Sequence, residues 1–356
     1  MFSPLFKQPD TLIGQRCGMQ ELEEKWPEKQ YFQGLALTGG GFRGIFAAQA
    51  LAAIEAKIAQ PIGRKFDLLC GTSIGGIVAL AAAFEVPMKR VVDVFGAHGL
   101  RIFPEHARAP RNGLAGKWDL LRHLGKPRYS TQALRDAIEE LIPKNTFLGD
   151  SLHPVAIPAV NLTQGSPQVF KTRHKRAWER DSKFRVTDVA LATAAAPTFF
   201  ELAEIDGNRY ADGGLFANAP DQIVLHEAEH YFGVDPGMVR LLSIGTTTRS
   251  YSIAHSAGRN FGIADWMDET RLFSVMISAQ QQFVGQIMQH RLSDRYLRLD
   301  REPSHEQAEE LGLDVATEGA RVTLTSLADK ATSDILNTKL LPFLEHVPHL
   351  KIKRDQ

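Results

Sequence analysis

Residues 66–84, FDLLCGTSIGGIVALAAAF, join two apolar runs through a short glycine-rich segment. The run before Gly71 predicts a buried strand, and the Ala-rich run after Ser73 predicts a helix. Gly71, Ser73 and Gly75 therefore form a Gly-x-Ser-x-Gly pattern at a strand-to-helix turn, where a serine hydroxyl projects from the edge of a sheet. The N-terminus of the following helix favours negative charge at that place. We interpret Ser73 as a nucleophile, with Gly71 and Gly75 as the glycines of its elbow.

A second glycine-rich stretch, LALTGGGFRG at residues 35–44, supports two interpretations. Gly39, Gly41 and Gly44 match the Gly-x-Gly-x-x-Gly fingerprint of dinucleotide-binding folds. Alternatively, a glycine turn at this place offers backbone N–H groups to an oxyanion. A dinucleotide-binding fold needs an acidic residue about 20 residues further on, at the end of the second strand. That strand ends in the glycine–serine turn instead, and Asp67 lies at its start, so an NAD(P)-dependent oxidoreductase is the disfavoured alternative.

Composition sets broad limits on function. The 356 residues include 41 basic and 41 acidic side chains, and 44% of the residues are hydrophobic, as in ordinary soluble globular proteins. This charge balance argues against a DNA or RNA partner. The two cysteines, Cys17 and Cys70, have no metal-ligand spacing and suggest a reducing compartment, so no metal is expected. The longest apolar run, at 77–84, is far shorter than the ~20 residues of a membrane span, which leads us to expect a cytoplasmic protein with peripheral membrane contact.

The order of predicted elements indicates the fold class. Strands and helices alternate, which predicts an α/β fold with a mainly parallel central sheet flanked by helices. We divide the chain into an N-terminal arm at 1–30, a catalytic domain at 31–250 and a mainly helical extension at 251–356 that packs on the core. Residues 207–220 are expected to form a loop, and the basic segment 101–128 either a solvated excursion or a lid. Strands are expected at 32–38, 65–71, 153–162, 166–172 and 239–246, and helices at 44–58, 74–84, 130–142, 187–197 and 221–233.

A serine hydroxyl is a weak nucleophile and needs an adjacent base. The histidines late in the chain do not follow a strand in a glycine-bounded loop, where the histidine of a catalytic triad usually lies. His226 and His230, four residues apart on a predicted helix, would need a third ligand to hold a metal. Asp212, in YADGGLF at 210–216, is the better-placed base. By itself Asp-Gly indicates an ordinary turn, but it stands here with two other glycine motifs.

Four motifs in order resemble those of the patatin-like phospholipases: GGGFRG (39–44), GTSIGG (71–76), ATAAAPTFF (192–200) and ADGG (211–214). The resemblance covers about residues 30–250. It implies a patatin-like three-layer α/β fold, a Ser-Asp dyad without a catalytic histidine, and no catalytic cofactor. Carried over by position, Ser73 is the nucleophile and Asp212 the general base.

The resemblance also implies how the glycine loop acts. The backbone N–H groups of Gly39, Gly40 and Gly41 would form an oxyanion hole, and Arg43 would brace the loop. Thr38 departs from the family pattern, which often has Asp before the triple glycine. Because the donors are backbone groups, we expect this departure to leave the chemistry intact.

Within the family, the chain is most similar to bacterial antiphage effectors of the CapV type, which are phospholipases activated by a cyclic dinucleotide. This similarity rests on chain length, the LTGGGFRG form and the tail HRLSDRYLRLD at 290–300. It implies a cyclic dinucleotide activator and membrane phospholipid as substrate, with contact at the inner face of the cell membrane. Arg291, Arg295 and Arg298 are candidate phosphate ligands, or else part of a solvated helix face. An unregulated lipase or esterase, a catalytically silent scaffold and a homo-oligomer remain open.

Overall fold

A computed structural model of the protein describes residues 26–105, 126–174, 179–248 and 271–349, with 250–253, 255, 258–262 and 266 between them. Most of the expected N-terminal arm and of the basic segment at 101–128 lies outside these residues. The strands are β1 (Phe32–Leu37), β2 (Leu68–Gly71), β3 (Val155–Asn161), β4 (Ser166–Lys171), β5 (Ala203–Ile205), β6 (Asn208–Asp212), β7 (Val239–Ile244) and β8 (Tyr296–Leu299). The helices are α1 (Gly44–Ile58), α2 (Ile74–Ala83), α3 (Met88–Ile102), α5 (Thr131–Leu141), α6 (Val186–Ala194), α7 (Gly214–Ala217), α8 (Asp221–His226), α10 (Arg271–Leu292), α11 (His305–Glu310), α12 (Glu318–Ile335) and α13 (Leu341–Leu344).

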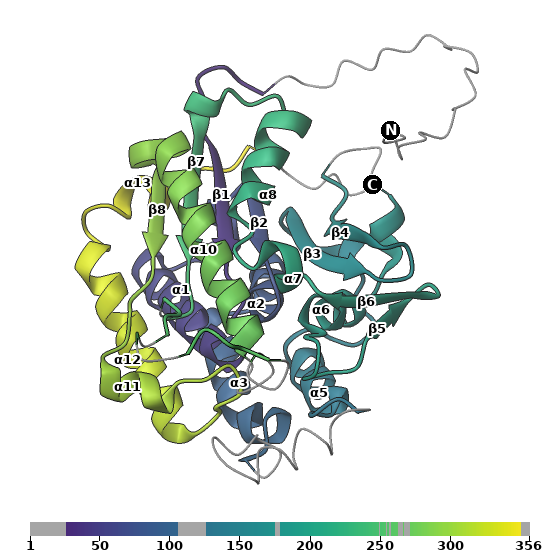
Figure 1. Ribbon diagram of the computed structural model, residues 1–356. Coiled ribbons are helices and arrows are strands. Elements are labelled where there is room, and N and C mark those ends of the chain that lie inside the picture. Colours follow the sequence, from purple (N-terminus) through teal and green to yellow (C-terminus); the bar gives the residue numbers. More distant parts are fainter. Residues whose placement is uncertain are drawn as a thin grey trace, which may run out of the picture.

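An 8-stranded sheet runs through the molecule in the order β5-β6-β3-β2-β1-β7-β8, with β4 paired to β3 (Figure 1). The strands from β3 to β8 along this order are parallel to their neighbours, whereas β4 and β6 pair antiparallel with β3, and β5 pairs antiparallel with β6. This topology confirms the mainly parallel α/β sheet. Because the carboxyl ends of parallel strands meet at one edge, the turns after β1 and β2 come together there.

Both faces of the central strands are buried, which explains their continuous apolar runs. Leu35 and Leu69 belong to a core that includes residues of α1, α2, α3, α5, α6 and α12. Ala36 and Cys70, one position further along each strand, point to the opposite core, which includes residues of α8 and α10. The molecule therefore has the expected three layers. Among the residues that the structure describes, no helix combines the length and hydropathy needed to span a bilayer.

β6 and β8 lie where the sequence prediction gave a different kind of structure, and β5 has no predicted counterpart. β6 lies within residues 207–220, which we expected to be a loop, and pairs with both β3 and β5. β8 lies in the extension that we expected to be mainly helical, and pairs in parallel with β7. The sheet therefore continues beyond residue 250. Both strands are short and carry polar residues, as in NRYAD and YLRL, so they lack a clear apolar periodicity.

Asp67 has a structural role at the opposite end of the sheet from the glycine loop. Its buried carboxylate accepts hydrogen bonds from the N–H of Gln33 (2.9 Å) and of His349 (2.6 Å). It also lies 2.7 Å from Nε2 of His346. Asp67 thus ties the C-terminal segment to the start of the central strands, in agreement with its expected place at the start of the second strand.

Candidate active site

Ser73 lies where the pattern places it, in the turn between β2 and α2. Its backbone has φ 56° and ψ −128°, a left-handed conformation that is rare for residues other than glycine and typical of functional sites. The flanking glycines leave no room for side chains. A Cβ on Gly71 would lie 2.1 Å from the carbonyl oxygen of Gly75, and a Cβ on Gly75 would lie 2.4 Å from that of Leu37. The turn therefore has the geometry of a nucleophile elbow.

Thr193, near the end of α6, connects this elbow to the strand end that carries Asp212. The Ser73 N–H donates to Thr193 Oγ1 (3.0 Å), and the Thr193 hydroxyl donates to the carbonyl oxygen of Pro158 (2.6 Å). The N–H of Gly213 donates to the Thr193 carbonyl oxygen (3.3 Å). We recognised the surrounding motif in the sequence but not this contribution of Thr193.

Asp212 ends β6 and is only 2% exposed. Its carboxylate accepts a hydrogen bond from the N–H of Gly214 at 2.7 Å, and the side chain of Ser73 lies near enough to favour its charged form. Burial raises the pKa of Asp212 to about 7, although the Gly214 N–H and the Ser73 side chain favour the charged form. A carboxylate with a pKa near neutrality is well matched to general base catalysis. This arrangement can take the proton from the serine hydroxyl.

The glycine loop offers fewer donors than we expected. The N–H of Gly39 donates to the carbonyl oxygen of Asn218 (3.0 Å), so it is already engaged. Gly40 and Gly41 line the pocket beside the nucleophile, and within the described parts of the chain no protein group accepts from their N–H groups. Gly41 has φ 56°, and a Cβ there would lie 2.0 Å from the carbonyl oxygen of Leu313. The candidate oxyanion donors are therefore Gly40 and Gly41.

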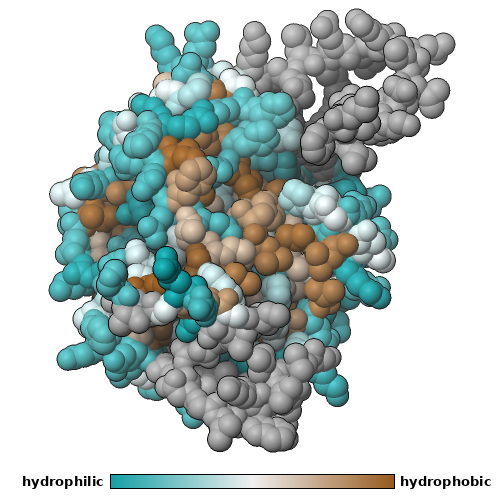
Figure 2. All heavy atoms as spheres, viewed as in Figure 1, coloured by the Kyte–Doolittle hydropathy of each residue, from teal (hydrophilic) through white to brown (hydrophobic). Residues whose placement is uncertain are grey.

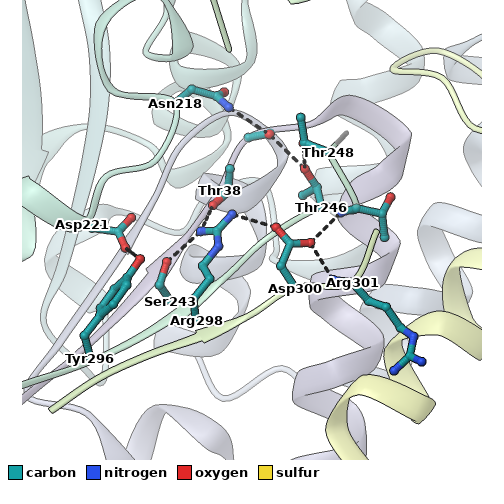
Figure 3. Close-up of polar contacts among 12 residues, drawn as sticks. Thr38, Asn218, Asp221, Ser243, Thr246, Thr248, Tyr296, Arg298, Asp300 and Arg301 are labelled. Carbon is teal, nitrogen blue, oxygen red and sulfur yellow. Dashed lines mark hydrogen bonds and ion pairs between the residues drawn. The ribbon is translucent and has the colours of Figure 1, made fainter. Parts of the chain in front are cut away.

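The loop is held from both sides. Nε of Arg43 donates to the carbonyl oxygen of Gly40 at 3.5 Å. Burial lowers the pKa of Arg43 to about 10, so this side chain stays charged at neutral pH. On the other side, Nδ2 of Asn218 and Oγ1 of Thr246 each donate to the carbonyl oxygen of Gly39 at 3.2 Å (Figure 3). These contacts fix the peptide planes from which the free N–H groups project.

Arg298, a candidate phosphate ligand in the sequence, is built into the fold. Its guanidinium donates to Oγ1 of Thr38 (2.8 Å), Oγ of Ser243 (2.8 Å) and Oδ2 of Asp300 (2.9 Å), as Figure 3 shows. Burial opposes the charge, but the carboxylate of Asp300 and other neighbouring groups hold the pKa of Arg298 above its ordinary value. Arg298 therefore anchors β8 to the residue that precedes the glycine loop.

The other two arginines of this tail have different partners. Arg291 pairs with Glu229 at 2.7 Å, and its side chain is 48% exposed. Arg295 lies 3.5 Å from the carbonyl oxygen of Pro236, before β7. The structure therefore does not bring the three arginines together on a common partner.

An apolar pocket opens beside Ser73. It holds about 640 Å³ of empty space, including a part open to solvent. Phe273 and Ile277 of α10 and Leu313, which follows α11, contribute to its wall, so residues beyond 250 complete the pocket. Apolar walls around one reactive hydroxyl suit a long acyl chain. Its other large apolar residues include Phe95, Phe103, Phe199 and Phe200.

The three-layer fold, the serine elbow and the buried carboxylate together define an α/β serine hydrolase. The family model described as patatin-like phospholipase matches residues 35–225, and the chain belongs to this family. Family membership rules against the oxidoreductase alternative.

Two bacterial relatives extend this similarity over most of the chain, and a third matches more than half of it. A Pseudomonas aeruginosa protein (strain BWHPSA011 / Pa011) named cGAMP-activated phospholipase is 37% identical over 315 residues, which cover 88% of this chain and 91% of that protein. A Vibrio cholerae protein (serotype O1, strain ATCC 39315 / El Tor Inaba N16961) of the same name is 34% identical over 344 residues, covering 90% and 96%. An Escherichia coli protein named cUMP-AMP-activated phospholipase is 28% identical over 222 residues, covering 59% and 63%.

Proposed function

We propose that this protein hydrolyses the acyl esters of membrane phospholipids, with Ser73 as nucleophile and Asp212 as general base. Asp212 takes the hydroxyl proton while the Ser73 oxygen attacks the ester carbonyl carbon. The carbonyl electron pair moves onto oxygen, where the N–H groups of Gly40 and Gly41 stabilise the charge. The tetrahedral intermediate then expels the alcohol, which receives the proton from Asp212. Water attacks the acyl-enzyme by the same route and releases the fatty acid.

The observation that carries this proposal is the pairing of Ser73 with a buried carboxylate at the wall of an apolar pocket. Because the pKa of Asp212 is raised to about 7, this carboxylate is a stronger base than an exposed aspartate and is still ionised in part at neutral pH. No histidine is needed in this scheme, since Asp212 lies beside the nucleophile in the wall of the same pocket.

The surface near the pocket supports a lipid substrate. Figure 2 shows apolar side chains gathered on the face of the molecule that carries α7 and α10. Leu202 and Leu272 are exposed, and each lies within two residues of a phenylalanine that lines the pocket. We propose that this apolar face rests on the membrane and that lipid enters the pocket from it. Exposed large apolar residues of these elements are Phe216 (40%) on α7 and Leu272 (52%) and Phe283 (63%) on α10, and Leu202 (46%) precedes β5.

We further propose that a cyclic dinucleotide activates the enzyme. Two relatives whose names state activation by cGAMP match 88% and 90% of this chain. These matches include residues beyond 225, which the family model does not cover. That part supplies Phe273, Ile277 and Leu313 to the pocket, so a ligand bound there can change the site. The relatives are named for different cyclic dinucleotides, which leaves the identity of the activator to experiment.

The test is fatty-acid release from phosphatidylethanolamine–phosphatidylglycerol vesicles, measured with and without each member of a panel of cyclic dinucleotides. We expect one member to raise the rate. Equal rates throughout would contradict activation and favour an unregulated lipase. Absence of release under every condition, together with no hydrolysis of a soluble ester, would contradict the hydrolase itself and favour a silent scaffold.

A further inference from the structure

The side chain of Gln280, in the middle of α10, binds three backbone groups of the segment that follows Asp212. Its Oε1 accepts from the N–H of Asn218 (3.1 Å). Its Nε2 contacts the carbonyl oxygens of Gly214 (3.2 Å) and Leu215 (3.4 Å). A single amide from the C-terminal part of the chain therefore holds α7 and the residue that follows it.

Asn218 carries this connection to the glycine loop. It is 2% exposed and lies in the wall of the pocket. Its carbonyl oxygen accepts from the N–H of Gly39 (3.0 Å), and its Nδ2 donates to the carbonyl oxygen of the same glycine (3.2 Å). Figure 3 shows the Asn218 side chain directed at the loop, with Thr246 on the other side of the same carbonyl group. Both polar groups of the Gly39 residue are thus fixed by Asn218.

The same segment fixes the other two parts of the site. The N–H of Gly214 donates to the carboxylate of Asp212 (2.7 Å). The hydroxyl of Thr72, the residue before the nucleophile, donates to the carbonyl oxygen of Ala217 (2.6 Å). Residues 213–218 therefore contact the base, the elbow and the oxyanion loop.

We propose that Gln280 and Asn218 are positioning residues for the hydrolysis, and that through them α10 sets the relative placement of Asp212 and the oxyanion donors. This inference rests on the proposed function of the same site. Neither side chain carries a charge, so their contribution is geometric. Without the Gln280 amide, the N–H of Asn218 loses its acceptor, and the segment can shift. A displacement of ~1 Å at catalytic groups can lower the rate by about 100-fold.

A positioning residue and a residue that only supports folding can be distinguished by which measured quantity their substitution lowers, kcat or the melting temperature. A residue that only supports folding lowers the melting temperature and leaves turnover by the folded enzyme unchanged. A residue that holds the base and the oxyanion donors in place lowers kcat, because these contacts act in the transition state. KM for a small soluble ester depends little on them.

The experiment measures kcat and KM on a soluble nitrophenyl ester, with the same saturating cyclic dinucleotide, for wild type, Gln280→Ala, Gln280→Glu and Asn218→Ala. The matched control is Gln289→Ala on the same helix, where the exposed amide donates to the carbonyl oxygen of Ser293 and has no other hydrogen-bond partner among the described residues. We expect kcat to fall about 10- to 100-fold in the Gln280 and Asn218 variants, with little change in KM. The Gln289→Ala control should match wild type.

A double-mutant cycle sharpens the test. If Gln280 acts through Asn218, the variant that lacks both side chains should lose little more than the more damaged single variant. Gln280→Glu keeps the shape and the acceptor oxygen, so it gives a folded protein to measure if Gln280→Ala does not fold. Wild-type kcat in folded Gln280→Glu or Gln280→Ala would overturn the positioning role and leave the proposed function standing. Wild type without any ester hydrolysis would overturn both.

Discussion

Arg298 and Thr38 are joined by a hydrogen bond of 2.8 Å, which links the last strand of the sheet to the residue before the glycine loop. The positive charge of Arg298 is balanced by Asp300 at 2.9 Å and not by residue 38. Thr38, where the family pattern often has Asp, contributes a neutral hydroxyl, and Asp300 is the carboxylate next to the guanidinium. An arginine that the sequence offered as a phosphate ligand is therefore part of the framework of the site.

Replacing Arg298 with alanine should destabilise the fold. The change leaves Asp300 without its cationic partner and removes a donor from Thr38 and Ser243. We expect the free energy of unfolding to fall by about 2–3 kcal/mol, measured by denaturant titration. Arg291→Ala removes a mostly exposed pair and should cost less than about 1 kcal/mol. Equal losses in the two variants would contradict the framework role of Arg298.

The hydrolysis rate should depend on pH through the ionisation of Asp212. The general base acts as the carboxylate, and burial raises its pKa to about 7. We therefore expect kcat/KM on a soluble ester to rise with pH and to level off above about 7. A profile that has already levelled off at pH 5, as for an exposed aspartate, would show that this pKa does not govern the reaction.

The same raised pKa predicts that Asp212 makes the folded protein less stable at neutral and alkaline pH than at acidic pH. Between about pH 4 and 7 the folded state keeps a proton that the unfolded chain has released, so the contribution of Asp212 to stability falls as the pH rises through this range. Asp212→Asn removes this cost and keeps the shape of the side chain. The variant should exceed wild type in stability by up to about 4 kcal/mol at pH 8. Unfolding titrations at pH 5 and pH 8 test this, and a difference that does not grow with pH would contradict it.

A charge on the apolar face should weaken the binding and hydrolysis of membrane phospholipid but not the hydrolysis of a soluble ester. Phe283 is 63% exposed on α10, and burial of such a side chain contributes about 1.5–3 kcal/mol. Phe283→Glu should therefore lower vesicle binding and vesicle hydrolysis about tenfold or more, with unchanged hydrolysis of a soluble ester. Val347→Glu is the matched control, since Val347 is 73% exposed next to Gln30, which precedes β1 at the other end of the sheet. If the two substitutions lower vesicle binding and vesicle hydrolysis equally, the apolar face is not the membrane-binding surface.

The sequence predicted best those parts of the structure that are determined by residues adjacent in the chain. The elbow at Ser73 follows from a strand, a glycine–serine turn and a helix that are continuous in the chain. The place of Asp212 follows in the same way from a glycine turn. β8 escaped prediction because its four residues include Arg298, whose charge is balanced only once the strand lies beside β7.

Contacts between distant segments could not be predicted. Asn218 and Gly39 are 179 positions apart, so nothing in the glycine motif indicates that the N–H of Gly39 is engaged. Gln280 lies in an ordinary helical stretch whose role depends on where α10 packs. Arg291 and Arg298 are close in the sequence, yet one lies on a helix and the other on a strand, and they contact different parts of the protein.

The central claim is that Ser73, activated by Asp212, cleaves phospholipid esters. Its most direct test is the rate of fatty-acid release from phospholipid vesicles by folded Ser73→Ala, compared with wild type under the same activating conditions. Loss of the nucleophile should lower the rate at least about 10³-fold, with an unchanged circular dichroism spectrum. Release by Ser73→Ala at a rate near that of wild type would contradict the claim.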